Sequence, residues 1–495
     1  MHVSRRHALI SLASAAATSA LPACGGGSFV PAPAPLPSPT TTYDVIIVGA
    51  GCAGIAAARA ALSYGANVLV LEAQNRIGGR AYTDTETFSE IGFDLGAQFF
   101  QACLTGDELF EIAQAQGLTL LDSAGTGPPE SLGVAITLGT AAASAENVAE
   151  LFTTLGALKA AILTAGAAIS AAPSLDVPVS SILTPSITSL PWYETAAIQS
   201  INGIVGGPSA SLLDLYVYTN FEPLPFGTPG SDFLVKSGMG TFIASLAKGL
   251  PIVMSAPVTS ITTGGATVSV TTGSTTYQAK TVIVTAATNV LAKSNTSGGI
   301  SFSPPLPSSY VNAFAGLPLA SVYKSLLGFK SPFQFIVPGV SPQQSFSVVL
   351  PLTNNAICTF FPNFWGTNTC EFIADGTLAQ TLDAAGNQGA APMLLAQLET
   401  VFPGATAAWD GRITGSNWMS NRYFGGAYSA ALPGQYGSRA LIQKPIANQL
   451  WFAGEATSTG GERGLLLAAY RTGLTAGTAA ATTALKISGA SARKR

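Results

Sequence analysis

Histidine is nearly absent from this sequence. Its two histidines, His2 and His7, both stand at the extreme N-terminus of a chain of 495 residues. Because we interpret that terminus as a removable export signal, the mature chain has no histidine. This excludes Ser-His-Asp and Cys-His catalysis, ordinary histidine-based metal sites and attachment of a cofactor through histidine. No metal site is expected.

Charge and cysteine are also scarce. Only 9% of residues are charged, the formal net charge is −3, and there are 5 cysteines. With no basic cluster, nucleic acid is not an expected partner. Cys358 and Cys370 have the spacing of two hairpin strands, so they either pair in an oxidising compartment or remain free buried thiols. The length predicts two or three domains.

Residues 1–24 have the pattern of an export signal. Arg5 and Arg6 precede an Ala-rich apolar segment, as in twin-arginine signals, and this segment is too short for a good membrane span. Cys24 follows Leu21-Pro22-Ala23, which resembles the lipobox of bacterial lipoproteins; ordinary cleavage nearby is the alternative. The Pro-rich residues 25–42 would form an extended linker. We predict a periplasmic or envelope-anchored protein that is peripheral to the membrane through Cys24.

The chain is organised around a predicted βαβ unit at residues 43–72. An apolar strand runs into a Gly-x-Gly-x-x-Gly turn, then a helix at 55–64, then a second strand at 67–71 that ends at an acidic residue. This pattern is typical of dinucleotide binding, with the pyrophosphate at the helix N-terminus and the acid on a ribose. The residues expected to take part are Gly49, Gly51, Cys52, Ala53, Gly54, Glu72 and Ala73. A tight turn without a ligand is the alternative.

Two later phrases distinguish FAD from NAD. Arg76-Ile77-Gly78-Gly79-Arg80 and Asp94-Leu95-Gly96-Ala97-Gln98 resemble the flavin-containing amine oxidase family, which includes monoamine, polyamine and L-amino-acid oxidases. Further resemblance lies in the segment at Val258, in Leu450–Thr457, and in Gly464–Gly473. The resemblance implies FAD held by Arg80, Gly96, Ala97, Gln98, Val258, Gly454, Glu455 and Leu466, in addition to the turn residues. Ala427 stands where monoamine oxidases have a flavin-linked cysteine, so the FAD should be noncovalent.

The resemblance also implies the catalytic residues. Lys324 matches a lysine that holds a water against flavin N5, although a surface lysine on an alternating strand is the alternative. Tyr428 matches an aromatic wall facing the flavin beside the substrate amine. Phe99, Trp418, Tyr428 and Leu465 are the expected substrate contacts. Because Leu465 stands in the place of a second aromatic residue, the aromatic cage looks incomplete.

These observations predict an α/β fold. Its Rossmann-like FAD-binding domain, of the FAD/NAD(P)-binding type, would comprise residues 43–120, 232–310 and 411–487. A substrate-binding domain would be inserted as residues 121–231 and 311–410. The first insert is predicted to be all-helical, with helices at 141–172, after Asp176 and at 193–204. The second insert is predicted to be β-rich. An Ala-rich soluble helix is favoured over a membrane span at 141–172.

The predicted activity is FAD-dependent oxidation of the C–H next to nitrogen in a small-molecule amine. The product would be an imine that hydrolyses, and O2 or another acceptor would reoxidise the flavin. One alternative is a desaturase, an isomerase or a renalase-like nicotinamide oxidase on the same scaffold. Another is a tethered electron-transfer flavoprotein. The sequence does not identify the amine, and it leaves open whether the protein is a homodimer.

Overall fold

A computed structural model describes most of residues 38–487. The gaps are 102, 104–105, 123–132, 139–140, 143, 184–200, 202–206, 208, 222–231, 294–296, 334–345, 352–356 and 401. The predicted export signal, Cys24 and most of the predicted linker lie outside the described residues, as does nearly all of the helix expected at 193–204.

The first sheet contains the predicted βαβ unit. Its strand order is β10-β2-β1-β13-β12-β11-β14, and β20 also pairs with β13. Strands β10, β2, β1, β13 and β20 are parallel, whereas β12 is antiparallel to both β11 and β13. The strands are β1 (Thr42–Val48), β2 (Val68–Leu71), β10 (Ile252–Val253), β11 (Val258–Thr262), β12 (Val268–Thr272), β13 (Thr275–Val284), β14 (Ser301–Ser303) and β20 (Leu450–Phe452).

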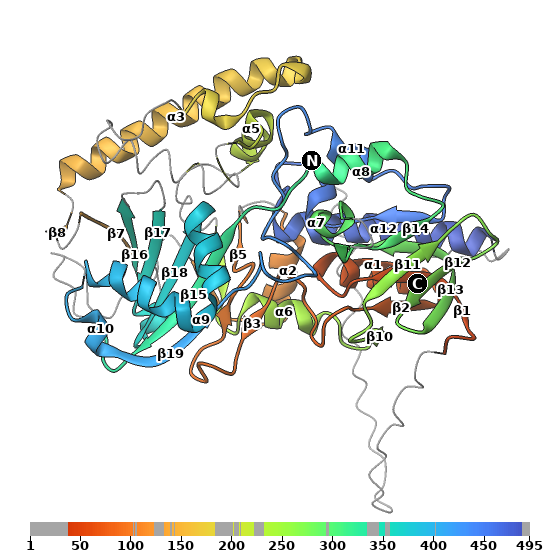
Figure 1. The fold of residues 1–495 in the computed structure, drawn as a ribbon, viewed down its shortest axis with the longest axis horizontal. Coiled ribbons are helices and arrows are strands. Elements are labelled where there is room, and N and C mark those ends of the chain that lie inside the picture. The colour runs from red at the N-terminus through yellow and green to blue at the C-terminus, as the bar shows by residue number, and fades with distance from the viewer. Residues whose placement is uncertain are drawn as a thin grey trace, which may run out of the picture. The chain divides into compact units, whose positions relative to one another are not determined.

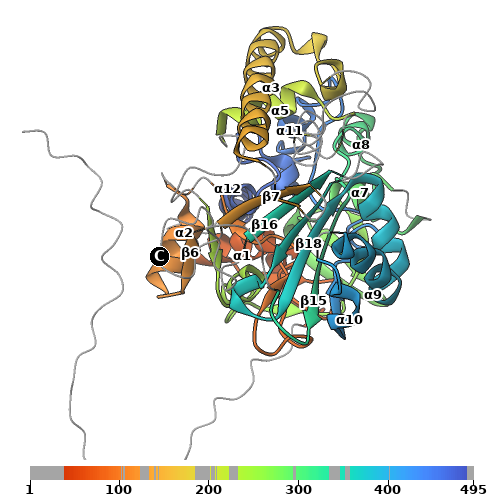
Figure 2. The same cartoon turned by 90° about the vertical axis from the view of Figure 1, so that its left-hand side faces the viewer.

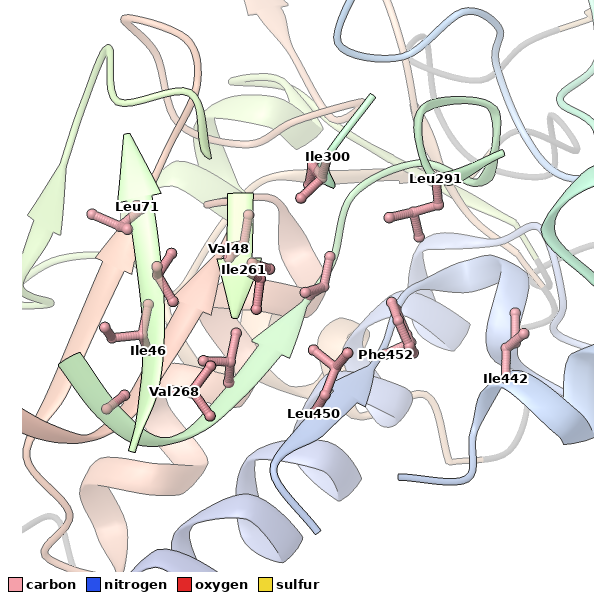
Figure 3. Packing of buried hydrophobic residues seen from close by; sticks show 14 of the residues in the cluster. Ile46, Val48, Leu71, Ile261, Val268, Leu291, Ile300, Ile442, Leu450 and Phe452 are labelled. Atoms are coloured by element: carbon pink, nitrogen blue, oxygen red, sulfur yellow. The ribbon is translucent and has the colours of Figure 1, made fainter. Parts of the chain in front are cut away.

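Both faces of this sheet are covered, which explains the uninterrupted apolar runs of β1 and β2. Ile46, Val48 and Leu71 point to one face, where they pack with residues of β11, β12 and β20 (Figure 3). Val45 and Ile47 point to the other face, toward the alanines of α1 (Cys52–Ser63) and α12 (Leu466–Ile487). The α/β prediction with a parallel sheet is therefore confirmed.

Helices α1 and α12 pack closely and run in the same direction. A Cβ on Gly473 would lie 2.2 Å from the Ala53 carbonyl oxygen, and one on Gly477 would lie 2.3 Å from that of Ala57. The two N-termini therefore adjoin, and Cys52 Sγ lies 3.8 Å from the Leu466 carbonyl oxygen. The last helix begins at Leu466, two residues after the predicted start at Gly464.

The second sheet has the order β19-β15-β18-β17-β16-β7-β8 (Figure 1). Helix α9 (Gly376–Glu399) covers one of its faces (Figure 2). The strands are β7 (Gly133–Leu138), β8 (Ala141–Ala142), β15 (Val322–Phe329), β16 (Phe346–Pro351), β17 (Ile357–Pro362), β18 (Thr369–Asp375) and β19 (Trp409–Gly415). Strands β7 and β8 belong to the first insert, so the prediction that this insert is all-helical was wrong: β7 pairs in parallel with β16, a partner distant in sequence.

The described part of the first insert contains two helical segments of the kind expected. Helix α3 (Ala145–Ala171) begins later than predicted because residues 141–142 pair with β7, and it packs on α5 (Leu212–Phe221). Within the described residues 176–183, the passage after Asp176 forms the short 3-10 turn η2 (Val179–Ser181). Among the described helices, one segment, Ala149–Ala171, is long and apolar enough to cross a membrane by length and composition, with a mean hydropathy of 1.5 and 22% of its most apolar window buried.

The remaining described elements are short, and some of them form the two small sheets β3-β4 and β5-β9-β6. They are β3 (Thr83–Asp84), β4 (Phe93–Asp94), β5 (Phe99–Phe100), α2 (Glu108–Ala115), β6 (Leu120–Asp122), η1 (Pro173–Leu175), β9 (Phe233–Val235), α6 (Met239–Ser245), α7 (Thr288–Leu291), α8 (Ser308–Ala315), η5 (Phe364–Gly366), α10 (Ala405–Ala408), α11 (Ser438–Ile442) and η6 (Glu455–Thr457). Tyr310, Phe314 and Leu317 pack in the core of the first sheet, and β19 begins at Trp409 in the second. The chain therefore leaves the core of the first sheet after Leu317, and β19 of the second sheet extends to Gly415.

Candidate active site

The Gly-rich turn at the start of α1 is shaped by contacts that exclude side chains. Gly49 has φ +105°, and a Cβ on Gly54 would lie only 1.9 Å from the Gly49 carbonyl oxygen. No side chain caps the N-terminus of α1 at Gly51. The second glycine pair lies directly against the turn, because Gly78 N–H donates to the Ala50 carbonyl at 3.0 Å. The free helix N-terminus beside two glycine loops fits a pyrophosphate.

Glu72 lies at the end of β2 and is 5% exposed. Its carboxylate accepts hydrogen bonds from Ala50 N–H at 2.6 Å and Gln74 N–H at 2.8 Å. Burial raises the pKa of Glu72, and these hydrogen bonds oppose that shift. Ala73 follows Glu72, and Val258 begins β11 nearby, since Ala256 N–H donates to the Glu72 carbonyl at 2.7 Å. The residues predicted for the adenosine half of FAD therefore lie together.

A second group of predicted residues meets around Arg80. Its Nη1 contacts Glu455 Oε1 at 2.8 Å and the Ala427 carbonyl oxygen at 2.5 Å. Ser429, which follows Tyr428, donates its hydroxyl to Glu455 Oε2 at 2.6 Å. The 22-residue helix α12 begins close by, and a Cβ on Gly464 would lie 3.9 Å from Cδ2 of the Tyr428 ring. Arg80, Gly454, Glu455, Tyr428, Leu465 and Leu466 are thus brought to one place beside the α1 N-terminus.

A buried ion cluster supports this group, and sequence reasoning missed it. Asp214 of α5 pairs with Arg463 at 2.9 Å and Arg439 at 3.3 Å. Arg439 donates to the Ser429 hydroxyl at 2.9 Å, so the cluster extends to Glu455. Burial raises the pKa of Asp214, but the two arginines outweigh burial and hold it below its ordinary value. The three charged residues lie in segments that are distant in sequence. Their spacing matches no known motif, so the sequence alone did not indicate the cluster.

Lys324 of β15 is 6% exposed, which is inconsistent with the surface-lysine alternative. Its Nζ donates to the Asp94 carbonyl at 2.8 Å, the Gln98 Oε1 at 2.7 Å and the Gly96 carbonyl at 3.3 Å. These three oxygens match the three hydrogens of an ammonium. Burial lowers the pKa of Lys324, and the attraction of Glu371 and Asp94 opposes that shift.

Glu371 of β18 is the second residue that sequence reasoning missed. Its carboxylate is 1% exposed and lies 3.4 Å from Lys324 Nζ. Gln98 Nε2 donates to its Oε2 at 3.3 Å, whereas its Oε1, the oxygen nearest Lys324, accepts no hydrogen bond from the described part of the chain. Burial raises the pKa of Glu371, and Lys324 opposes this. The sequence did contain one indication of a buried functional carboxylate, because Glu371 is an acidic residue inside the apolar stretch Thr369–Ala374.

The segment that contains Gly96 and Ala97 connects the residues around Lys324 to the residues around Arg80. Ala97 N–H donates to the Arg80 carbonyl at 3.1 Å, and a Cβ on Gly96 would lie 1.8 Å from that oxygen. Trp418 Nε1 donates to the Leu95 carbonyl at 2.8 Å, and its ring packs in an apolar cluster that Phe99 also contacts. The predicted catalytic, flavin-edge and substrate residues therefore surround one region.

Tyr428 is partly exposed in this region. Burial raises the pKa of its phenol well above the ordinary value, Asp375 and Tyr218 add to the shift, and Arg463 opposes it. A phenol in this state is neutral across the physiological pH range, so its ring and hydroxyl act as an uncharged wall.

No cluster of metal-ligating side chains occurs among the described residues. Cys358 and Cys370 are buried free thiols, so they do not pair with each other.

Comparison with known proteins identifies the family. Residues 160–481 match the family described as flavin containing amine oxidoreductase, and residues 47–115 match an NAD(P)-binding Rossmann-like domain. The chain belongs to the flavin-containing amine oxidoreductase family. The sequence resemblance is thereby confirmed, and the protein is an oxidoreductase that uses a flavin and acts on amines.

Relatives of this amine oxidoreductase extend over nearly its whole length. It is 27% identical over 452 residues to polyamine oxidase 4 of Oryza sativa subsp. japonica, covering 88% of this chain and 87% of that protein. It is 27% identical over 460 residues to polyamine oxidase 2 of Arabidopsis thaliana, with the same coverage of 88% and 87%. The structure of cyclohexylamine oxidase from Brevibacterium oxydans IH-35A has the same fold, with a TM-score of 0.69, 21% identity, and coverage of 89% of this chain and 99% of that one.

Proposed function

We propose that this amine oxidoreductase binds FAD noncovalently and oxidises small cationic amines, with O2 as the electron acceptor. The observation that carries the proposal is the arrangement around Lys324. A buried lysine and a buried glutamate adjoin the Arg80–Glu455 pair, beside the adjacent N-termini of two helices. When bound, the flavin supplies the acceptor for the hydride equivalent from the C–H next to nitrogen.

The residues present fit FAD along its length. Backbone N–H groups at the N-terminus of α1 would hold the pyrophosphate, and the region of Glu72 and Val258 would hold the adenosine half. The N-terminus of α12 would favour negative charge at the pyrimidine end of the flavin. Ala427 has no nucleophilic side chain, which supports noncovalent binding. Tyr428, Trp418, Phe99 and Leu465 would orient the amine, and Lys324 with Glu371 would order polar groups next to it.

The proposal is tested by anaerobic reduction of the bound flavin. We expect a panel of primary amines, diamines and polyamines to bleach the absorbance of the oxidised flavin in the purified protein. Readmitting O2 should restore the colour and release H2O2. Bleaching by NADH alone would instead favour the nicotinamide-oxidase alternative. No bleaching by any member of the panel would contradict amine oxidation.

We also propose export by the twin-arginine route and anchoring to the cell envelope through a lipid on Cys24. The arginine pair, the lipobox-like Leu21–Cys24 and the Pro-rich linker support this proposal. The full-length protein should fractionate with membranes, and Cys24→Ala should release it into the soluble fraction. Soluble wild-type protein would contradict the anchor. Whether the protein is a homodimer would be tested separately, by measuring the molar mass of the detergent-solubilised protein with light scattering.

A further inference from the structure

Glu371 of β18 has few hydrogen-bond partners for a buried carboxylate. It is 1% exposed, and Gln98 Nε2, at 3.3 Å, is the one described group that donates a hydrogen bond to it. Its Oε1 lies 3.4 Å from Lys324 Nζ. Replacing a buried ion pair by well-packed apolar residues is often neutral or stabilising. Stability alone therefore does not account for a carboxylate at this position.

Lys324 directs its hydrogens elsewhere. They go to three uncharged oxygens, which are the Asp94 carbonyl at 2.8 Å, the Gln98 Oε1 at 2.7 Å and the Gly96 carbonyl at 3.3 Å. Three acceptors require the three hydrogens of an ammonium, so this arrangement favours the charged form of the lysine. Because those hydrogens are engaged, Glu371 acts on Lys324 mainly through its charge.

Among the described residues, the Asp94 side chain is the other carboxylate whose charge acts on Lys324. It accepts hydrogen bonds from the Thr83 hydroxyl at 2.6 Å and from two backbone N–H groups at the start of α6, at 2.7 and 3.1 Å. Burial raises the pKa of Asp94 to about 6. Asp94 is thus satisfied by groups on β3 and α6, whereas Glu371 is paired with the lysine.

The Lys324–Glu371 pair is attached to the segment 94–98, which is expected to hold the flavin. Lys324 binds backbone carbonyls of this segment, and Ala97 N–H donates to the Arg80 carbonyl at 3.1 Å. Charges near a flavin ring tune its electronics. Reduction adds negative charge, which a nearby cation stabilises and a nearby anion destabilises. The net charge of the pair therefore affects how easily the flavin is reduced.

We propose that Glu371 is a positioning residue that neutralises the charge of Lys324 and thereby lowers the reduction potential of the flavin. The proposal rests on the FAD binding proposed above. In the wild type the two opposite charges cancel. In Glu371→Gln the ammonium would remain, held by its three acceptors, and the pair would have a net positive charge. A lower potential in the wild type makes the reduced flavin a better electron donor to its acceptor.

The effect of Glu371→Gln should be confined to a window of pH. Burial raises the pKa of Glu371 and lowers the pKa of Lys324, and each group opposes the shift of the other. Below the pKa of Glu371 the wild-type carboxyl is protonated, so both proteins have the same positive charge. Above the pKa that Lys324 has in the variant, the lysine is neutral and neither pair has a net charge. The difference in potential between the two proteins should therefore rise and then fall as pH increases.

The test is the two-electron reduction potential of the FAD-loaded protein, measured anaerobically against reference dyes at several pH values and without any amine. Near neutral pH, Glu371→Gln should raise the potential by about 30 mV, which is tenfold in the equilibrium constant of a two-electron couple. Lys324→Met should lower the potential, because the carboxylate loses its partner. The double variant Lys324→Met with Glu371→Gln has no net charge and should have the wild-type potential. Glu371→Asp keeps the charge and should also keep the potential.

A matched control is Asp410→Asn on β19 of the same sheet, where Asp410 pairs with Arg412 at 2.8 Å. This variant should leave the potential unchanged. Because Asp94 titrates in every protein of the series, its contribution cancels when potentials are compared at one pH.

The proposal is overturned if Glu371→Gln has the wild-type potential throughout, if its shift is the same at every pH, or if the double variant retains the shift. If Glu371→Gln does not load FAD, Lys324→Met provides the test with the opposite sign, and an unchanged potential there overturns the proposal. A wild-type protein that binds no FAD would contradict the proposed cofactor instead. A wild-type flavin that no amine reduces would contradict amine oxidation and leave the comparison of potentials intact.

Discussion

Replacing Lys324 by Met tests how Lys324 and Glu371 depend on each other. Met keeps the apolar stem of the lysine but removes its charge and donors. Glu371 is 1% exposed, and in the variant Gln98 Nε2, at 3.3 Å, would be the one described group that still donates to its carboxylate. Removing one partner of a buried pair costs about 3–5 kcal/mol because the other charge stays buried without compensation. Lys324→Met should therefore destabilise the fold by about 3–5 kcal/mol.

Replacing the other partner, in Glu371→Gln, should cost less stability than Lys324→Met. In Glu371→Gln the lysine keeps the Asp94, Gly96 and Gln98 oxygens as acceptors. The double variant Lys324→Met with Glu371→Gln should recover more than half of the loss, because neither charge remains. Lys330→Met is the matched control: among the described residues this exposed lysine donates to the Ala407 carbonyl alone, so the change should stay within about 0.5 kcal/mol.

The loss in Lys324→Met should depend on pH. Burial holds the pKa of Glu371 above its ordinary value of 4.5, and removing the lysine removes the attraction that opposes this shift. The folded state then binds a proton that the unfolded state has released, so stability falls as pH rises between the unfolded and folded pKa values. The deficit should be larger at pH 8 than at pH 5, and the double variant should show less of this dependence.

The assay is thermal unfolding of the FAD-saturated proteins, followed by tryptophan and released-flavin fluorescence. A loss of 3–5 kcal/mol corresponds to a Tm lower by roughly 6–20 °C on the scale of domains of 150–250 residues. A Lys324→Met variant as stable as the wild type at both pH values would refute the reasoning. A double variant no more stable than Lys324→Met would also refute it, because the loss would not then come from the uncompensated carboxylate.

Other substitutions test the remaining parts of the site. Asp214→Asn leaves two buried arginines without their carboxylate and should cost about 3–5 kcal/mol in urea unfolding; since the pKa of Asp214 is lowered, this contribution should fade as pH falls below its ordinary 3.8. Acid denaturation should release intact FAD into the supernatant, because Ala427 offers no attachment point, and colour in the pellet would contradict this. Gly54→Ala should prevent FAD loading, since its Cβ would lie 1.9 Å from a carbonyl oxygen. Glu72→Ala should lower FAD occupancy in the purified protein, and an equally loaded variant would exclude that role.

Local sequence by itself determined the first sheet and its cofactor class. Contacts within the βαβ unit require three features: the continuous apolar run of β1, the glycine spacing and the alanines of α1. Because these contacts join neighbouring segments, the features can be recognised in one short stretch of the sequence. The family phrases around Arg80, Gln98 and Glu455 also pointed to residues that lie together in the structure. The apolar residues around Lys324 favoured a functional lysine over a surface lysine, and the structure shows the side chain to be buried.

Only the tertiary structure decided how the second sheet completes the site. The pairing of β18 with β15 brings Glu371 to Lys324 and Asp375 to one side of it, and no local pattern specifies this register. Strand β7 joins the sheet through β16, more than two hundred residues away in the chain, so its environment could not be inferred from its neighbours. The Asp214 cluster likewise unites α5 with two C-terminal segments. Charges separated widely in sequence become partners only when the packing of both sheets places them together, which is why their pairing, unlike the βαβ unit, required the structure.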